Sequence, residues 1–484
     1  MNRRDFLMQA VAGGVETVLC RGNFATALQT TSGKPRLVVK LDSAQTVATI
    51  PANFIGLGYE ISSIARPGLL SSQNAVYLQL VRILGKQGVI RVGGNTSDYA
   101  LYKETGEPFS SPEKVGGSVI NAAVLRDLGS FLDATGWQLI WGLNLGNGTP
   151  ENAIQEAKAV IATAKNHLIA FEIGNEPDLF PLHQSHRATG YSYDKYLREY
   201  RTYRDALRKA IPDVPLAGPD AADATDWVVR FARDEGRDVK LLTHHYYREG
   251  QNPSSTIDKL LHPDPKLDPL LAKLRGASDA SRVPFRICET NSFSGGGKPG
   301  VSDTFAAALW VLDFMFTLAA EGCDGVNIET GVNQLGFISS YSPIGDDERG
   351  HYWATPEYYG MLAFAQSGRG RVIGSSINAG GRNINAYATQ AAPDSVVLIV
   401  INKEPSLPAD ILVDEGARPS FRSRSLCRLW GPSLQSHLGI SLGGSEISSD
   451  GLWRPSRIED LGAARDILRF TVPAASAAIV TLNA

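Results

Sequence analysis

Short apolar runs alternate with amphipathic stretches along most of the chain. Eight of these runs are largely continuous in apolar residues, as parallel strands buried on both faces are. They begin at Phe54, Val89, Gln138, Leu168, Val214, Asp238, Phe285 and Gly325. Helical spacing fills the segments between them, as in Ile154, Ala157 and Ile161. Eight strand–helix units in series predict an α/β fold, a (β/α)8 TIM barrel, over residues 53–368.

The pattern changes after about residue 369. Short β-type runs are then separated by glycine, proline, serine and aspartate, which is typical of antiparallel strands. These runs are Asn383–Ala388, Ser395–Asn402 and Ile467–Val472. We therefore predict an appended antiparallel β-sandwich over 369–484. The segment 29–52 contains two further strand-like runs, 36–41 and 47–50, which we expect to join this sandwich.

The first 28 residues are predicted to be an export signal rather than part of the fold. Arg3 and Arg4 precede a short, mostly apolar stretch, Leu7 to Leu19, in the arrangement of a twin-arginine signal. Small residues suited to cleavage follow at Ala25 to Ala27. The sequence thus predicts an exported protein, periplasmic or secreted.

Composition excludes several classes of partner. The chain of 484 residues has 47 basic and 50 acidic residues, a net charge of −3, and no block of like charges. This balance argues against nucleic acid or an anionic membrane surface as a partner. No apolar stretch after the signal reaches the ~18 residues that span a membrane. The four cysteines show no metal-type spacing, and we expect no metal and no cofactor.

Two glutamates are the strongest candidates for chemistry. Glu176 stands in Asn-Glu-Pro after an apolar strand, and the proline forces a turn that would push it into the barrel opening. Glu289 ends another buried strand, Phe285 to Cys288. Two carboxyl groups at one rim are the equipment for cleaving a glycosidic bond, and in a retaining enzyme they stand about 5–5.5 Å apart. We predict Glu176 as the acid/base and Glu289 as the nucleophile.

Other carboxylates lie near the same rim. Glu60 ends the first strand and Glu329 the eighth, so we expect both to bind sugar hydroxyl groups. Asp98 follows the second strand and ranks below the chosen pair. Glu172 lies inside the fourth strand, and we expect it to be a structural group paired with a base such as Arg91.

His244-His245-Tyr246-Tyr247 closes the sixth strand. Two adjacent histidines on a strand point to opposite faces, which makes a metal site built on this pair improbable. A tyrosine hydroxyl that steadies Glu289 is the better use of the motif. Whether Tyr246 or Tyr247 supplies it depends on the register.

A run of three glycines follows Glu289, in Ser294 to Lys298. Its backbone N–H groups would make a cradle for an anion, and a flexible connector is the equal alternative. No Ser or Thr follows Lys298, so the run is not a phosphate loop.

With these motifs the chain resembles glycoside hydrolase family 79, which includes heparanase and bacterial β-glucuronidases. The resemblance covers nearly the whole chain after the signal. Its motifs are Tyr59-Glu60-Ile61, Arg91-Val92-Gly93-Gly94, Gly174-Asn175-Glu176-Pro177, His244-His245-Tyr246-Tyr247, Glu289-Thr290, Ser294-Gly295-Gly296-Gly297 and Ser302 to Ala307.

The resemblance implies a retaining β-glucuronidase that acts by double displacement. It assigns Asn175, Glu60 and Tyr246 to sugar contacts. It also implies that Gly295 and Gly296 hold the C6 carboxylate through backbone N–H groups.

The chain departs from heparanase at two places in the sugar site. Ser294 stands where heparanase has a tyrosine, so one hydroxyl contact is shorter or lost. Tyr341 is a candidate for a second carboxylate-binding tyrosine, although Phe337 lies nearer the expected place and cannot hydrogen-bond.

Three alternatives stay open at this level. The leading interpretation is cleavage of terminal β-linked glucuronic acid in an oligosaccharide or glycan. The first alternative is endo-acting, heparanase-like cleavage of a sulfated polymer, which the absence of a long basic stretch disfavours. A related barrel glycosidase on a neutral sugar is the second alternative, and a non-catalytic carbohydrate-binding protein is the third.

Overall fold

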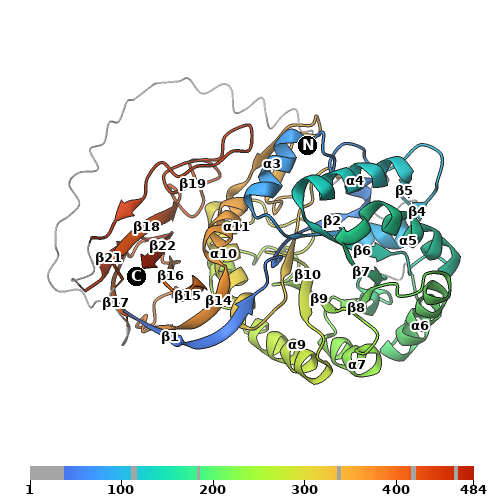
Figure 1. Ribbon diagram of the computed structural model, residues 1–484, viewed down its shortest axis with the longest axis horizontal. Coiled ribbons are helices and arrows are strands. Elements are labelled where there is room, and N and C mark those ends of the chain that lie inside the picture. Colours follow the sequence, from blue (N-terminus) through green and yellow to red (C-terminus); the bar gives the residue numbers. More distant parts are fainter. Residues whose placement is uncertain (1–36, 111–116, 183–185, 335–338, 416–420, 463–466) are drawn as a thin grey trace. The chain divides into compact units, whose positions relative to one another are not determined.

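A computed structural model describes most of the chain (Figure 1). The described residues are 37–110, 117–182, 186–334, 339–415, 421–462 and 467–484. The expected export signal, the first residues of the predicted sandwich segment and Phe337 lie outside them.

Eight parallel strands close into a barrel in the order β10-β11-β2-β3-β6-β7-β8-β9. Each begins within three residues of its predicted start, which confirms the (β/α)8 prediction. The strands are β2 (Ile55–Glu60), β3 (Val89–Gly93), β6 (Gln138–Leu143), β7 (Leu168–Ile173), β8 (Leu216–Ala221), β9 (Leu241–Tyr247), β10 (Phe285–Asn291) and β11 (Val326–Glu329).

Helices alternate with these strands and surround the barrel (Figure 1). They are α2 (Ile61–Ile64), α3 (Ala75–Ile83), α4 (Ala122–Thr135), α5 (Pro150–Ala164), α6 (Tyr193–Ala210), α7 (Thr225–Glu235), α8 (Ile257–Leu261), α9 (Leu267–Ser281), α10 (Phe305–Ala320) and α11 (Pro356–Ser367). Local sequence sets their starts. Asn121 caps α4 and Thr149 caps α5, where Pro150 takes the first position, which needs no N–H donor.

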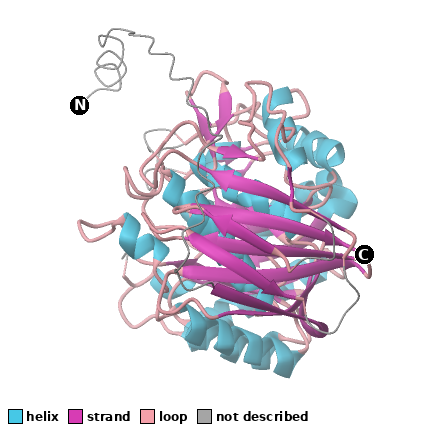
Figure 2. Cartoon of the chain, turned by 90° about the vertical axis from the view of Figure 1, so that its left-hand side faces the viewer, coloured by secondary structure: helices cyan, strands magenta, loops and turns pink. Residues whose placement is uncertain are grey.

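A second, ten-stranded sheet packs beside the barrel. Its main path runs β19-β18-β22-β16-β15-β14-β1-β17-β21, and β20 pairs with β18. The strands are β1 (Leu37–Ile50), β14 (Gly370–Ile377), β15 (Ile384–Ala392), β16 (Ser395–Asn402), β17 (Ala409–Asp414), β18 (Ser423–Trp430), β19 (Ser441–Leu442), β20 (Glu459–Asp460), β21 (Arg469–Val472) and β22 (Ser476–Asn483). Figure 2 shows these strands face-on.

The sheet folds over on itself to make two layers. Val39 of β1 and Ile411 of β17 share one buried core with Leu398 of β16 and Val480 of β22. The prediction of purely antiparallel strands is wrong at one place, because β1 and β17 pair in parallel. The two short runs predicted before the barrel are one strand, β1, whose register with β14 shifts between Asp42 and Thr46.

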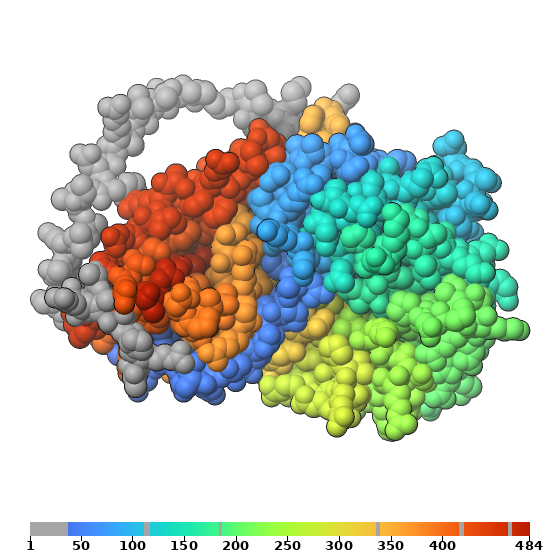
Figure 3. Space-filling view, viewed as in Figure 1, coloured from blue at the N-terminus to red at the C-terminus, as the bar shows by residue number. Residues whose placement is uncertain are grey.

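Helix α10 joins the barrel to this sheet. Thirteen of its sixteen residues are buried, because it is covered on one side by the barrel and on the other by the sheet. Asp313 of α10 accepts hydrogen bonds from Lys403 at 2.5 Å, Tyr387 at 2.8 Å and Asn385 at 2.7 Å, all in or next to β15 and β16. In Figure 3 the blue β1 lies beside the orange and red C-terminal residues, so both ends of the described chain build this sheet.

Candidate active site

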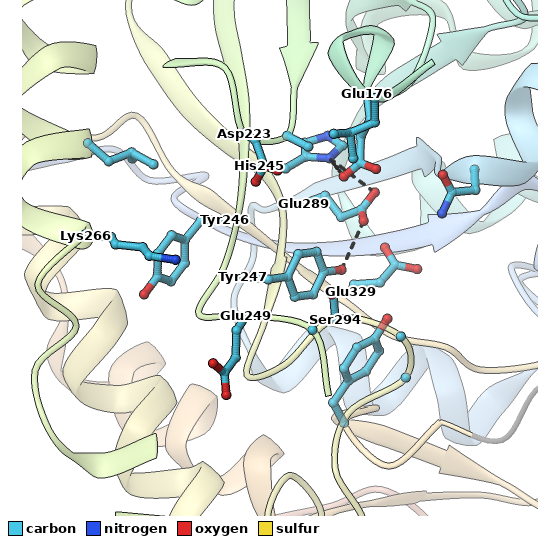
Figure 4. A pocket seen from close by; sticks show the side chains of 18 of the residues that line it. Glu176, Asp223, His245, Tyr246, Tyr247, Glu249, Lys266, Glu289, Ser294 and Glu329 are labelled. Carbon is cyan, nitrogen blue, oxygen red and sulfur yellow. Dashed lines mark hydrogen bonds and ion pairs between the residues drawn. The ribbon is translucent and has the colours of Figure 1, made fainter. Parts of the chain in front are cut away.

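A cavity of about 810 Å³ opens where the carboxyl ends of the barrel strands meet (Figure 4). Nine of the ten predicted site residues line it. They are Glu60, Glu176, Tyr246, Glu289, Ser294, Gly295, Gly296, Glu329 and Tyr341. The tenth, Asn175, is buried directly behind the wall, where its side-chain oxygen accepts a hydrogen bond from Arg91 at 2.8 Å.

The turn after β7 delivers Glu176 to the cavity. Gly174 and Glu176 both take positive φ angles, 85° and 49°, and Pro177 then begins a short 3-10 helix, η3 (Pro177–Leu179). Positive φ is unfavourable for a residue with a side chain, so the surrounding structure must hold Glu176 in place. Part of that support is a hydrogen bond from its N–H to the Asp220 carbonyl, at 2.9 Å.

Glu289 enters the cavity from β10 and faces Glu176. A carboxylate oxygen of each residue lies within 4.8 Å of the other. Arg91 donates to Glu289 Oε2 at 2.7 Å, and the Tyr247 hydroxyl donates to Oε1 at 3.0 Å. Dashed lines in Figure 4 mark the Tyr247 contact. Arg91 therefore compensates the charge of an ionised Glu289, and Tyr247 orients it.

His245 bridges the two halves of the site. Its Nδ1 lies 2.9 Å from Glu176 Oε1, and its Nε2 lies 2.8 Å from Asp220 Oδ1. Burial lowers the pKa of His245, but the carboxylates of Asp220 and Glu289 outweigh that effect and hold the pKa well above its usual value. The ring is therefore an imidazolium that donates from both nitrogens.

Glu176 has the properties of a proton donor. Burial raises the pKa of Glu176 to about 7, and the hydrogen bond from His245 partly opposes that rise. Its side chain is 12% exposed and lines the cavity. A carboxyl group with a pKa near neutral can give up and take back a proton in one reaction cycle.

Arg91 is the centre of the buried charge network. It contacts Glu172 at 3.1 Å and Asp220 at 2.6 Å in addition to Glu289. The Glu172–Arg91 pair confirms the expected structural pairing. Sequence reasoning missed the roles of Asp220 and His245. The sequence signal that could have identified Asp220 is its position near the end of the fifth barrel strand, after an apolar run.

The tyrosine that contacts Glu289 is Tyr247. The Tyr246 hydroxyl instead donates to Asp264 at 2.8 Å, and its ring stacks on Phe314. Because side chains alternate along a strand, His245 and Tyr247 of β9 both reach the carboxylate pair. Tyr246 still lines the cavity, but its hydroxyl is already engaged.

The glycine run forms part of the opposite wall. Gly295, Gly296 and Gly297 all have positive φ, between 80° and 89°. In the described part of the chain no acceptor takes the N–H groups of Gly295 and Gly296, while Gly297 donates to the Phe293 carbonyl. Tyr341 lies close by and stacks on Tyr247 at 6.3 Å. Two cavity-lining residues, Gly295 and Gly296, thus have backbone N–H groups without an acceptor among the described residues.

Glu60 and Glu329 complete that side of the cavity. Glu60 accepts from the backbone of Asn95 and Thr96, and burial raises its pKa to about 7. Glu329 is 3% exposed, and neither of its oxygens has a partner among the described residues. Burial and the neighbouring Glu289 hold the pKa of Glu329 well above its usual value.

Glu176, His245 and Glu289 are close enough together to share one metal ion. However, both nitrogens of His245 already face carboxylates, and Arg91 already pairs with Glu289. The positive charge that a metal would bring is thus supplied by His245 and Arg91. His244 turns away from the cavity and contacts the His245 carbonyl, as the alternation along the strand predicts.

No protein-family model matches the chain. The β-glucuronidase of Neurospora crassa is 29% identical over 324 residues, which are 59% of this chain and 57% of that protein. The β-glucuronidase of Aspergillus niger is 26% identical over 63% of this chain and 61% of its own length. Heparanase of Mus musculus is 23% identical over 73% of this chain and 76% of its own length. These similarities to β-glucuronidases and heparanases agree with the resemblance to glycoside hydrolase family 79.

Solved structures support the same fold. A 4-O-α-L-rhamnosyl-β-D-glucuronidase from Fusarium oxysporum superposes with a TM-score of 0.75 at 19% identity, over 92% of this chain and all of that chain. A family 51 α-L-arabinofuranosidase from Bifidobacterium longum reaches 0.67 at 16% identity, over 93% of this chain and all of its own. At these identities the likeness concerns the fold alone. The match to the two fungal β-glucuronidases spans less than two thirds of their length.

Proposed function

We propose that this protein is a retaining β-glucuronidase that cleaves terminal β-linked glucuronic acid from an oligosaccharide or glycan. The observation that carries the proposal is the separation of Glu176 and Glu289, whose oxygens approach within 4.8 Å across the cavity. This upper limit is compatible with the ~5–5.5 Å spacing of retaining enzymes and lies below the ~6.5–9.5 Å of an inverting pair with a water between its carboxyl groups. The β-glucuronidases among the relatives support the choice of sugar.

In the first step Glu289 attacks C1 of the sugar. The bond from C1 to the leaving oxygen breaks, and protonated Glu176 gives its proton to that oxygen. Arg91 and Tyr247 hold the Glu289 carboxylate in line for this attack. The product is a leaving alcohol and a glycosyl ester on Glu289.

In the second step water hydrolyses that ester. Glu176, now a carboxylate, takes a proton from the water while the water oxygen attacks C1 and releases Glu289. Two inversions at C1 give net retention. His245 supports both steps, because its charge stabilises Glu176 after the proton has left.

We assign recognition of glucuronic acid to the part of the cavity wall that Gly295 and Gly296 form. The free N–H groups of Gly295 and Gly296 can donate to the C6 carboxylate, with the hydroxyl groups of Ser294 and Tyr341 nearby. A neutral sugar would leave these donors without a charged partner.

Turnover of 4-nitrophenyl β-glucuronide against the matched glucoside, xyloside and arabinoside tests the proposal. We expect the glucuronide to be preferred and Glu289→Gln to lose at least about 10⁴-fold in kcat, because no nucleophile remains. Good turnover of a neutral glycoside without the glucuronide would refute the choice of sugar. Hydrolysis that survives in Glu289→Gln would refute the nucleophile.

Endo-acting, heparanase-like cleavage is the second candidate, favoured by the similarity to mouse heparanase over 419 residues. Digestion of a reducing-end-labelled glucuronic-acid-containing glycan separates the two modes. Terminal cleavage releases monosaccharide from the start, whereas internal cleavage first produces intermediate oligosaccharides.

Export is proposed on the paired arginines alone. Replacement of Arg3 and Arg4 by lysine should retain the uncleaved chain inside the cell. N-terminal sequencing of the wild-type protein from the periplasm or medium should place the mature start near residue 28. Within the described residues, no helix combines the length and apolar character that a membrane span requires.

A further inference from the structure

The glycine run after β10 is tied to the loop that follows β9. Gly250 and Ser294 form a parallel β-bridge, in which the Ser294 N–H donates to the Glu249 carbonyl at 2.9 Å. The Gln251 N–H donates to the Ser294 carbonyl at 3.1 Å, and the Gln251 side-chain amide donates to the Gly295 carbonyl at 2.6 Å. Gln251 therefore holds two consecutive carbonyl groups of the run.

These two carbonyl groups determine where two N–H groups point. The peptide bonds of the run are trans, and in a planar trans peptide the C=O and the N–H that follows it point in opposite directions. The Ser294 carbonyl shares its peptide with the Gly295 N–H, and the Gly295 carbonyl shares its peptide with the Gly296 N–H. Both N–H groups thus point away from Gln251.

These are the two N–H groups that the protein leaves without an acceptor. Gly297 donates to the Phe293 carbonyl at 3.1 Å, and the Ser294 N–H is used in the bridge. By contrast, no acceptor among the described residues takes the N–H groups of Gly295 and Gly296. Consecutive N–H groups on one side of a loop form a concave site for an anion.

Gln251 itself lies outside the cavity lining. Gly295 and Gly296 line the cavity, whereas Gln251 is exposed and is not a cavity residue. A residue that holds the carbonyl side of each peptide from outside the lining leaves the N–H side available to a ligand in the cavity.

The segment that carries Gln251 is fixed by side-chain bonds to Glu249, two residues before it. Ser255 Oγ donates to Glu249 Oε1 at 3.1 Å, and Lys259 Nζ donates to Glu249 Oε2 at 2.6 Å. Gln251 is therefore anchored before any ligand arrives, and donors aligned in advance bind a ligand without a further ordering cost.

We propose that Gln251 is a positioning residue for substrate specificity, whose two donors align the Gly295 and Gly296 N–H groups for a carboxylate on the substrate. This inference rests on the proposed function, because it takes the ligand of these N–H groups to be the C6 carboxylate of glucuronic acid. The backbone bond to Ser294 survives a change of the Gln251 side chain. A side-chain variant should therefore misalign the Gly296 N–H, since glycine on both sides of that peptide restricts its rotation little.

Gln251→Met tests the inference, because methionine has nearly the same length as glutamine and no donor. We expect the KM for 4-nitrophenyl β-glucuronide to rise at least about fivefold while kcat changes less than about twofold, because the carboxylate is bound alike in the ground state and the transition state. The kcat/KM for the matched glucoside should stay unchanged. Gln251→Glu keeps the shape but also lacks the amide donor, so it should raise the KM for the glucuronide at least as much.

Gln73→Met is the matched control, since Gln73 is exposed and is not a cavity residue. It should leave both KM and kcat unchanged. An unchanged KM for the glucuronide in both Gln251 variants would overturn the inference and leave the proposed function intact.

A loss that falls on kcat, or that is equal for glucuronide and glucoside, would also overturn the inference, because Gln251 would then support the fold rather than recognition. A wild-type protein that does not prefer the glucuronide would instead contradict the proposed function, and with it the carboxylate ligand on which the inference rests.

Discussion

At the residue scale, the chemistry of the site depends on which charges surround each carboxyl group. Glu176 and Glu289 are the same residue type, yet Glu176 contacts an imidazolium at one oxygen while Glu289 contacts Arg91 and Tyr247. Their different partners suit one to proton transfer and the other to nucleophilic attack.

His245→Asn tests the electrostatic part of this arrangement. Asparagine can still hydrogen-bond to Glu176, but the positive charge that lowers its pKa is lost. The pKa of Glu176 should rise above about 7, so the alkaline limb of the kcat/KM profile should move to higher pH. The kcat should fall about tenfold or more, because the carboxylate after proton transfer is less stabilised.

His351→Asn serves as the matched control for that profile. His351 has a side chain 78% exposed, paired with Asp347, and is not a cavity residue. Its replacement should leave the limb in place. If the alkaline limb of the kcat/KM profile of His245→Asn stays at the same pH or moves to lower pH, the imidazolium does not have this role.

Glu329 makes stability depend on pH. Its pKa is raised in the folded protein, so between the unfolded value near 4.5 and the higher folded value the native state holds a proton that the unfolded chain releases. Stability attributable to this group is therefore lost as pH rises through that window. Glu329→Gln should raise the melting temperature at pH 7 relative to wild type and change it little at pH 4.

Differential scanning calorimetry at the two pH values measures this difference. Glu107→Gln, at an exposed glutamate, should show no such pH-dependent gain. Equal effects of Glu329→Gln at pH 4 and pH 7 would contradict a buried, protonated Glu329.

At the scale of elements, the sugar specificity that we propose depends on the loop after β10. It has three consecutive positive φ angles, which only glycine adopts without cost, and the N–H groups of Gly295 and Gly296 have no acceptor among the described residues. The neighbouring β9 supplies His245 and Tyr247 from alternate positions. In the proposed function, β9 and β10 thus supply His245, Tyr247 and the nucleophile Glu289, while the turn after β7 supplies the acid/base Glu176.

Gly295→Ala should disturb this loop because alanine is strained at a φ of 80°. A steric clash is not the cause, since the nearest atom to an added Cβ is 3.6 Å away. We expect the KM for 4-nitrophenyl β-glucuronide to rise about tenfold or more, because a hydrogen bond to a charged group contributes about 1.5–3 kcal/mol. Slow turnover of the matched glucoside should change far less.

Gly300→Ala imposes a similar strain, at φ 75°, with no neighbouring atom and outside the cavity lining. It should leave the KM unchanged. If Gly295→Ala reduces the kcat/KM for the glucuronide and for the glucoside by the same factor, the loop does not recognise the C6 carboxylate.

At the scale of the whole molecule, the described barrel and sheet share a buried polar contact. Asp313 accepts from Lys403, whose side chain is only 3% exposed. Asp313→Ala would leave that ammonium buried without its partner, so we expect a loss of about 3–5 kcal/mol in the free energy of unfolding. Denaturant titration measures it.

Asp347→Ala removes an exposed pair with His351 and should have little effect on the same titration. A loss in Asp313→Ala no larger than in this control would mean that the contact does not hold the two parts together.

Local patterns in the amino-acid sequence were enough to predict the eight barrel strands and the two glutamates. Strands buried on both faces are continuously apolar, which is a local property of the sequence. The turn at Asn175-Glu176-Pro177 is also predicted locally, because proline cannot continue the strand. The short β-type runs between turn residues also predicted a mainly antiparallel sheet in the C-terminal part of the chain.

Which groups contact those glutamates depends instead on long-range contacts in the folded chain. Arg91 lies 129 positions from Asp220, 154 from His245 and 198 from Glu289, and their charges combine only when the barrel closes. The choice of Tyr247 over Tyr246 likewise depended on the register of β9, and the parallel pairing of β1 with β17 on how the sheet folds. Contacts between segments far apart in sequence leave no local pattern, because no single segment specifies its neighbour.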